Sequence, residues 1–119
     1  SRLERKDSTV SGARLSVTPS DYQDLCADYA LPTARGLSYL IPGLCAEAGE
    51  VAGKYAKEIR DKVENNPSDV TKEVGDVLWF CAMICNYYGV PMEDVMRQNI
   101  EKLESRKQRG KIGGSGDNR

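Results

Sequence analysis

The 119-residue sequence contains no histidine, and this absence narrows the chemistry that the chain can perform. Without an imidazole group, histidine acid–base catalysis is excluded. The Glu-x-x-His pattern of ferritin-like bundles is also missing, which disfavours a carboxylate-bridged di-iron or di-manganese redox protein. Any catalytic site in this chain must therefore be built from other side chains.

Long apolar segments and a surplus of charge of one sign are missing as well. The longest uninterrupted apolar run, Val77 to Cys85, is about half of the roughly 20 residues that a membrane-spanning helix needs. No signal-like segment opens the chain, so we expect a cytoplasmic protein without a membrane partner. The 17 basic and 18 acidic residues give a net charge of -1, which disfavours a protein whose main role is to bind a nucleic-acid backbone.

The cysteines have no Cys-x-x-Cys spacing. We therefore expect reduced, buried thiols that pack as small apolar side chains. A metal pair formed by Cys81 and Cys85 is the alternative, but without histidine it would lack the usual further zinc ligands. The four cysteines are Cys26, Cys45, Cys81 and Cys85.

Apolar residues recur at steps of three or four, and we find no strand-like alternation of useful length and no internal repeat. This pattern predicts an all-α fold with four helices. The first begins at the Thr18-Pro19 cap and ends near Pro32, and the second covers about 39–63. The third covers about 69–88, and the fourth begins at Pro91 and ends near Gly110. We expect residues 1–17 to be a flexible arm, 18–110 the helical domain and 111–119 a glycine-rich tail that forms a loop or a lid.

The third predicted helix is unusual because it is apolar on every side between Val77 and Cys85. Such a helix is normally surrounded by others, and a thin four-helix protomer offers too little surface to bury it. We therefore expect self-association as a dimer, or as a tetramer of paired dimers.

Two acid-x-x-acid pairs lie on neighbouring predicted helices, Glu47 with Glu50 and Glu73 with Asp76. This spacing places both acids of a pair on one helix face. Glu73 falls within the apolar arc of its helix and Asp76 flanks that arc, so neither is expected on the solvent side. Because buried unpaired carboxylates are costly, four inward acids favour a shared magnesium or manganese ion. The alternative is that both pairs are solvated, since this spacing is common on exposed helices.

A glycine precedes the second acid of each pair, Gly49 in the first and Gly75 in the second. Glycine costs roughly 0.5 to 1 kcal/mol in a helix interior relative to alanine. Two glycines at equivalent places therefore predict that another segment approaches the backbone closely there.

The segments GLCAEAGEVAGKYAKEIRD (43–61) and TKEVGDVLWFCAMICNYYGV (71–90) resemble the Glu-x-x-Glu and Glu-x-x-Asp signature of the MazG-like all-α NTP pyrophosphohydrolases. The resemblance continues through NIEKLESRKQRGKIGGSGDNR (99–119), and it covers about residues 18–119. In one departure, Ala46 stands where the family often has a second acid before the first pair.

The resemblance implies a four-helix MazG-like bundle that uses Mg²⁺, or Mn²⁺, to cleave a nucleoside triphosphate to the monophosphate and pyrophosphate. A metal-activated water would attack the α-phosphorus, with the four paired acids as metal ligands and catalytic groups. Which carboxylate acts as base stays open, as do the preferred base and sugar, although we favour a deoxynucleotide. The implied role is house-cleaning of the nucleotide pool. The rival hypothesis is a non-catalytic helical-bundle interaction module.

Cations for the triphosphate are expected on two helices. Lys54 and Lys57 follow Glu50 along one stripe and could reach the phosphates, although each could equally be solvated or paired with nearby acids. The resemblance places Asn99 and Lys102 beside the nucleotide, ahead of Arg106 on the same face. The glycine-rich tail, with Lys111, Asp117 and Arg119, is expected to fold over the phosphates, with disorder as the alternative.

Aromatic side chains are the remaining candidates. Trp79 and Phe80, together with Tyr22 and Tyr39, are candidates to stack on the nucleotide base. The alternative is that they pack in the core, which is the commoner role of aromatic residues in helices.

Overall fold

The computed structural model describes residues 16–118, and within them all regular structure is helical. The prediction of an all-α fold is therefore confirmed. Residues 1–15 of the expected arm and Arg119 of the expected tail lie outside the described residues. No described helix combines the length and apolarity needed to cross a membrane. The elements are α1 (Pro19–Cys26), η2 (Ala27–Tyr29), η3 (Pro32–Arg35), α2 (Leu37–Asp61), α3 (Pro67–Tyr88) and α4 (Met92–Gln108), of which η2 and η3 are short 3₁₀ helices.

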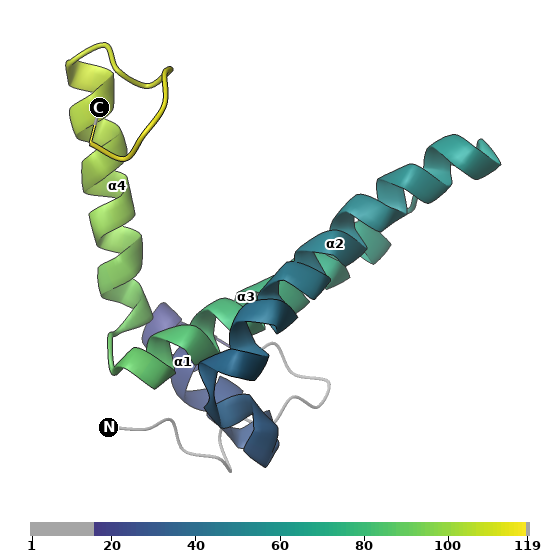
Figure 1. The fold of residues 1–119 in the computed structure, drawn as a ribbon, viewed down its shortest axis with the longest axis horizontal. Coiled ribbons are helices and arrows are strands. Elements are labelled where there is room, and N and C mark those ends of the chain that lie inside the picture. Colours follow the sequence, from purple (N-terminus) through teal and green to yellow (C-terminus); the bar gives the residue numbers. More distant parts are fainter. Residues whose placement is uncertain (1–15, 119) are drawn as a thin grey trace.

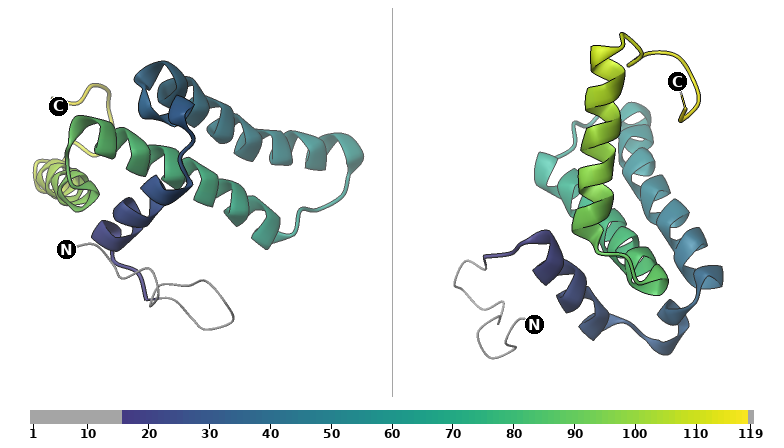
Figure 2. Two further views of the ribbon diagram at one scale, coloured as in Figure 1. Left: turned by 90° about the horizontal axis from the view of Figure 1, so that it is seen from below. Right: turned by 90° about the vertical axis from the view of Figure 1, so that its left-hand side faces the viewer.

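The helices α2 and α3 form an antiparallel hairpin that is the longest feature of the molecule (Figure 1). Helix α1 packs across α3 at the end of the hairpin opposite the turn between α2 and α3, and η3 also meets both helices of the hairpin there. Helix α4 leaves the end of α3 at a wide angle and packs chiefly on α1, as the further views confirm (Figure 2). The hairpin and α4 therefore diverge from a common base.

Local signals in the sequence account for most helix ends. Thr18 and Asp21 form a reciprocal capping box at the start of α1. The side chain of Asn66 accepts a hydrogen bond from the Ser68 amide at the start of α3, and Gly89 ends that helix in the left-handed conformation, with φ 68°. These ends follow from residues within one helical turn of each boundary.

Four boundaries of α1, α2 and α3 differ from the prediction by two residues or more. Helix α2 ends at Asp61 instead of about 63, and α3 begins at Pro67 instead of about 69. Helix α1 ends at Cys26, and the chain continues through the 3₁₀ turn η2 to extended residues before Pro32, which disfavours helical geometry in its predecessor. Helix α2 begins at Leu37, two residues earlier than expected, and continues through Pro42 without a break. Pro42 is the sixth residue of α2 and has no amide hydrogen to donate, so one backbone hydrogen bond of the helix is lost there.

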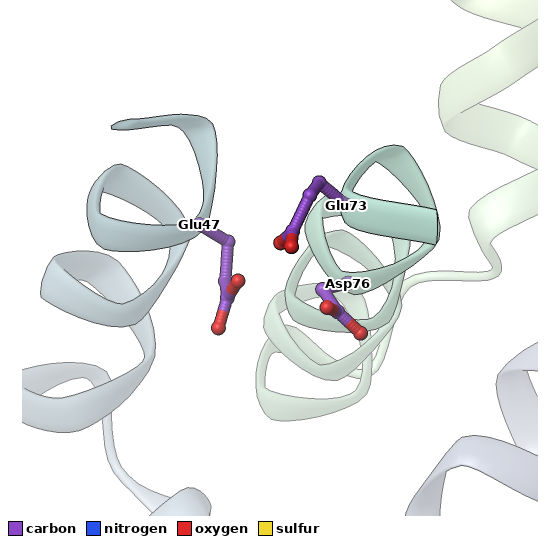
Figure 3. A group of neighbouring side chains, drawn as sticks. All are labelled: Glu47, Glu73 and Asp76. Atoms are coloured by element: carbon purple, nitrogen blue, oxygen red, sulfur yellow. The ribbon is translucent and has the colours of Figure 1, made fainter. Parts of the chain in front are cut away.

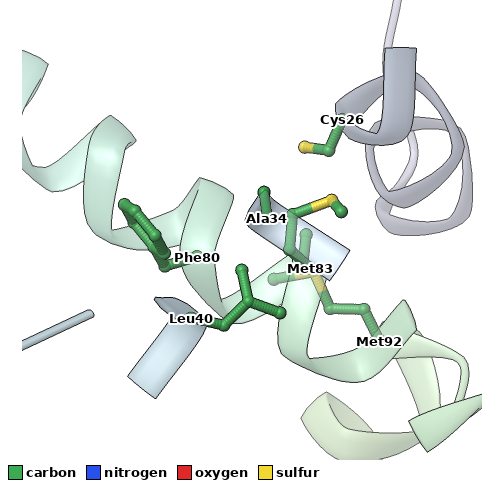
Figure 4. Packing of buried hydrophobic residues seen from close by; sticks show 7 residues of the cluster. Cys26, Ala34, Leu40, Phe80, Met83 and Met92 are labelled. Carbon is green, nitrogen blue, oxygen red and sulfur yellow. The ribbon is translucent and has the colours of Figure 1, made fainter. Parts of the chain in front are cut away.

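The buried core is small and lies where α1, η3, the start of α2 and the end of α3 meet (Figure 4). Leu40 is fully buried, and Phe80 and Met83 pack beside it from α3. The far end of the hairpin has no such core, because Tyr55, Ile59 and other apolar side chains there are exposed. The remaining buried apolar residues are Cys26, Ala34, Ala82 and Met92.

Gln23 ties α1 to the turn between α3 and α4. Its buried side chain donates from Nε2 to the Val90 carbonyl at 2.9 Å and accepts from the Met92 amide at 2.6 Å. The Asn86 side-chain amide donates to the Gln23 carbonyl at 3.2 Å. These bonds satisfy backbone groups where α4 begins, so Gln23 helps to fix the direction in which α4 departs.

The glycines beside the acids do not have the predicted role. A Cβ atom at Gly49 or Gly75 would meet nothing within 4 Å. The close approach is instead at Gly43, where a Cβ atom would overlap the ring of Phe80. Within the protomer, therefore, glycine is required where α2 crosses the core and not beside the acids.

The prediction that the cysteines are buried is wrong for Cys45, which is exposed on α2. Cys26 is buried, and Cys81 and Cys85 are partly buried on α3. All four are free thiols. Cys45 is exposed because the core covers only the face of α2 that carries Leu40 and Gly43.

Candidate metal centre

Three carboxylates meet between the two helices of the hairpin. Glu47 projects from α2 toward Glu73 and Asp76 on α3 (Figure 3). One carboxylate oxygen from each residue lies within 4.8 Å of the corresponding oxygens of the other two. No other group of three or more potential metal ligands is found within residues 16–118. Spacing in the sequence thus predicted three residues that the fold brings together.

The position of the cluster follows from the antiparallel hairpin. Glu73 and Asp76 are one helical turn apart, so they share a face of α3, and α2 runs beside that face. Glu47 and Glu73 are half-buried, whereas Asp76 is exposed. The prediction that the acids avoid solvent is therefore wrong for Asp76. Within the described residues, the cluster is therefore open to solvent on the side of Asp76.

The acids repel one another, and this is visible in the titration of Glu47. Desolvation of its carboxylate raises the pKa of Glu47 above the ordinary value, and the charges of Asp76, Glu73 and Glu50 raise it further. A divalent cation among these oxygens would remove that repulsion. Three hard oxygen ligands with a solvent-facing side fit magnesium or manganese, both of which retain bound water.

Glu50 is exposed and does not belong to the three-carboxylate group. Its charge nonetheless contributes to the raised pKa of Glu47, one turn before it on α2. Glu50 therefore lies beside the cluster, and its role as a ligand stays a prediction.

The two lysines of α2 lie farther along the hairpin. Lys54 is half-buried, and its backbone carbonyl accepts a hydrogen bond from the Asn65 side chain at 2.8 Å. Lys54 also lines an apolar hollow near the turn that joins α2 to α3, together with Val51 and Val70. Lys57 is exposed. The hydrogen bond with Arg60 lowers the pKa of Asp61, and the charge of Lys57 adds to this effect. Within the described residues, neither lysine forms an ion pair with the three acids.

The aromatic candidates lie in or beside the core. Phe80 is only 7% exposed and contacts Trp79 edge-on, with ring centroids 5.1 Å apart. Its ring also lies 5.8 Å from that of Tyr39. The indole Nε1 of Trp79 donates to the Cys26 carbonyl at 3.1 Å, which fixes the ring against α1. In the protomer these contacts match the packing alternative for Phe80 more closely than stacking on a base.

Tyr22 has a relation to the acids that the sequence pattern did not indicate. Burial, a hydrogen bond with Cys26 and the charge of Asp76 all raise the pKa of its phenol. Tyr22 is on α1, so its position near Asp76 depends on how α1 crosses α3. No spacing rule within one helix could have revealed this proximity.

The candidates on α4 lie apart from the acids. Asn99 is exposed, and Lys102 is half-buried beside the glycine-rich tail. Lys102 Nζ and Arg106 Nη2 each lie 3.3 Å from Asp117 Oδ1. Because α4 diverges from the hairpin, the fold of one protomer does not bring Asn99 or Lys102 to Glu47 (Figure 1).

Comparison with known proteins gives one family match and two similar proteins. Residues 35–110 match the sequence profile described as the MazG nucleotide pyrophosphohydrolase domain. The chain is 48% identical to the Gene 37 protein of Mycobacterium phage L5 over 89 residues, covering 71% of this chain and 78% of the phage protein. It is 39% identical over 72 residues to the uncharacterized protein YvdC of Bacillus subtilis (strain 168), covering 53% of this chain and 68% of that protein. No solved structure gives a significant match.

Proposed function

We propose, given that this chain belongs to the MazG nucleotide pyrophosphohydrolase family, that it hydrolyses a nucleoside or deoxynucleoside triphosphate to the monophosphate and pyrophosphate. The proposed cofactor is Mg²⁺, with Mn²⁺ as a substitute, and the proposed role is house-cleaning of the nucleotide pool. The observation that carries this proposal is the approach of Glu47, Glu73 and Asp76 within 4.8 Å.

Glu47, Glu73 and Asp76 are the proposed metal ligands, and Glu50 is the proposed fourth acid. A cation held there would neutralise phosphate charge and acidify a water molecule. A carboxylate oxygen that is not engaged in binding would orient that water toward the α-phosphorus and accept its proton.

The remaining proposed substrate contacts are side chains of the α2–α3 hairpin and of α4. Lys54 and Lys57 would approach the phosphates from α2, and Trp79 is the proposed aromatic contact of the base, with Phe80 packed against it in the core. Asn99 and Lys102 are on α4, which diverges from the hairpin. We therefore propose that Asn99 and Lys102 of one protomer serve the acids of another.

Self-association is supported by apolar side chains that one protomer leaves uncovered. Leu78 and Met96 line an apolar hollow between α1, α3 and α4, together with Tyr22 and Met92. From Met96 an apolar stripe continues along α4 through Ile100 and Leu103, which are 64% and 40% exposed. A second copy of the chain that packed between α4 and the hairpin would bury both the apolar hollow and the apolar stripe of α4. We therefore propose a dimer or a tetramer.

The experiment that tests the proposed function measures pyrophosphate release from a panel of ribonucleoside and deoxynucleoside triphosphates. We expect release with Mg²⁺ or Mn²⁺ and none with excess EDTA. Glu73→Gln should lower kcat at least about a hundredfold, because it removes a ligand charge near the reacting phosphate.

The matched control is Glu101→Gln, which makes the same substitution at an exposed position on α4. We expect it to retain the activity of the parent chain. If no triphosphate released pyrophosphate with either metal, the proposed function would be wrong and the non-catalytic interaction module would replace it. If Glu73→Gln turned over normally, the assignment of the metal centre would be wrong.

A further inference from the structure

The chain after α4 folds back against that helix. Gly110, Gly114 and Gly116 have φ values of 67°, 99° and 87°, a region that glycine adopts without strain. The loop that they form returns along the last turns of α4, so that residue 117 lies beside residues 102 and 106 (Figure 1). We refer to residues 110–118 as the return loop.

Two cations of α4 hold the return loop. Arg106 Nη2 donates to the Asp117 carbonyl at 2.7 Å and to the Gly116 carbonyl at 3.3 Å. Lys102 Nζ and Arg106 Nη2 both donate to Asp117 Oδ1 at 3.3 Å. The carboxylate of Asp117 thus bridges two cations that are one helical turn apart.

The cations and the carboxylate differ in burial. The side chain of Arg106 is 5% exposed, and its Nε has no hydrogen-bond partner among the described residues. The side chain of Asp117 is 82% exposed. Hydrogen bonds and charges of Lys102 and Arg106 lower the pKa of Asp117, so this carboxylate stays ionised. The buried guanidinium of Arg106, whose Nε is unbonded in the described part of the chain, is therefore paired with the solvated carboxylate of Asp117, and only one oxygen of that carboxylate accepts from it.

We propose that Asp117 is an internal competitor for phosphate, occupying Lys102 and Arg106 in the free protein and leaving them when a phosphate group binds. A phosphate group offers more acceptor oxygens and more charge than a carboxylate, and arginine binds it in a fork geometry that can also use Nε. The Asp117 carboxylate can leave at little cost because it is solvated, while Arg106 keeps its bonds to the Gly116 and Asp117 carbonyls. That the phosphate belongs to a nucleotide rests on the proposed function.

The test uses inorganic tripolyphosphate as the probe and isothermal titration calorimetry of the full chain in EDTA. Asp117→Asn keeps the size of the side chain but removes its charge, so competition weakens. We expect Asp117→Asn to bind tripolyphosphate about two- to fivefold more tightly than the parent chain, the range typical of one exposed ion pair.

Asp94→Asn is the matched control, because Asp94, in α4, has a side chain that is 49% exposed and likewise pairs with an arginine, Arg97, at 3.1 Å. It changes the net charge equally but should leave the affinity nearly unchanged. Repeating the comparison in a Lys102→Gln background should reduce the gain from Asp117→Asn, because one of the two contested cations is then absent. Circular dichroism checks that each variant remains helical.

The proposal is overturned if Asp117→Asn binds tripolyphosphate no more tightly than the parent chain, if neither binds it, or if Asp94→Asn gains as much. These outcomes are separate from the test of catalysis, since the titration contains no metal and requires no turnover. Tighter binding without any pyrophosphate release would leave the competition intact and refute only the proposed function.

Discussion

Glu47 is the acid of the candidate metal centre whose pKa is raised by burial and by the charges of its neighbours. It is half-buried, and the charges of Asp76, Glu73 and Glu50 add to the effect of its burial. Because its pKa is raised in the folded state, Glu47 favours folding below its ordinary pKa, and this contribution is lost as the pH rises through the raised value. At neutral pH the ionised side chain therefore destabilises the metal-free protein.

Glu47→Gln should consequently stabilise the metal-free protein near pH 7. We expect its melting midpoint in EDTA to rise by about 1–3 °C, since repulsion among partly solvated charges is screened. The gain should shrink as the pH is lowered toward 4.5, the ordinary pKa of the group, because the parent carboxylate then becomes protonated. Addition of Mg²⁺ should reverse the order by stabilising the parent chain more than the variant.

Differential scanning fluorimetry across pH, with and without Mg²⁺, makes this measurement. Glu101→Gln, at an exposed position on α4, is the control for loss of one negative charge. An unchanged or lower midpoint for Glu47→Gln in EDTA at pH 7 would contradict the repulsion, and an equal response of both proteins to Mg²⁺ would contradict the metal site.

At the scale of elements, three glycines of the hairpin differ in whether packing requires a glycine at their position. Gly43 faces Phe80 so closely that a methyl group there would overlap the ring, whereas Gly49 and Gly75 have open space beside them. The three glycines look alike in the sequence because each interrupts a helical segment. Only the crossing of α2 and α3 distinguishes them.

Gly43→Ala should lower the free energy of unfolding by about 1–3 kcal/mol, because Phe80 is held by Tyr39 and Trp79 and has little room to move. Gly49→Ala and Gly75→Ala should raise it by about 0.5–1 kcal/mol through helix propensity alone. Urea denaturation at one fixed protein concentration compares the three variants. A stable Gly43→Ala would contradict the packing described for the core, and a strongly destabilised Gly49→Ala or Gly75→Ala would reveal a neighbour beyond the protomer.

At the scale of the whole molecule, the divergence of α4 from the hairpin is the dominant feature (Figures 1 and 2). It leaves the apolar stripe of Met96, Ile100 and Leu103 exposed and keeps the cations of α4 apart from the acids. A second copy of the chain could cover the exposed stripe and also bring its α4 cations to the acids of the first copy. Association is therefore proposed as a condition for a complete site as well as for stability.

Ile100→Glu tests this association. We expect the parent chain to sediment as a dimer or a tetramer, and the variant to dissociate with a Kd at least about tenfold higher, because a buried isoleucine is worth about 1.5–3 kcal/mol. Gln98→Glu adds the same charge at an exposed position of α4 outside the stripe and should leave the assembly intact. Sedimentation velocity over a concentration series is the measurement. A monomeric parent chain, or equal association of both variants, would contradict the proposed interface.

The sequence by itself determined the helical class, most helix ends and three of the four acids that were predicted to meet in the hairpin. These features depend on local rules: apolar residues at steps of three or four, caps within one turn of each end, and acids one turn apart on a shared face. The approach of Glu47 to Glu73 and Asp76 followed because a short turn between two helices makes them antiparallel neighbours.

Only the tertiary structure decided how residues from different elements meet. It exposed Asp76 and Cys45, buried Phe80 against Gly43, brought Tyr22 near Asp76 and directed α4 away from the hairpin. The physical reason is that crossing angles depend on side-chain packing between helices and on bonds such as those of Gln23, which join residues far apart in the chain. Periodicity within one helix carries no information about either.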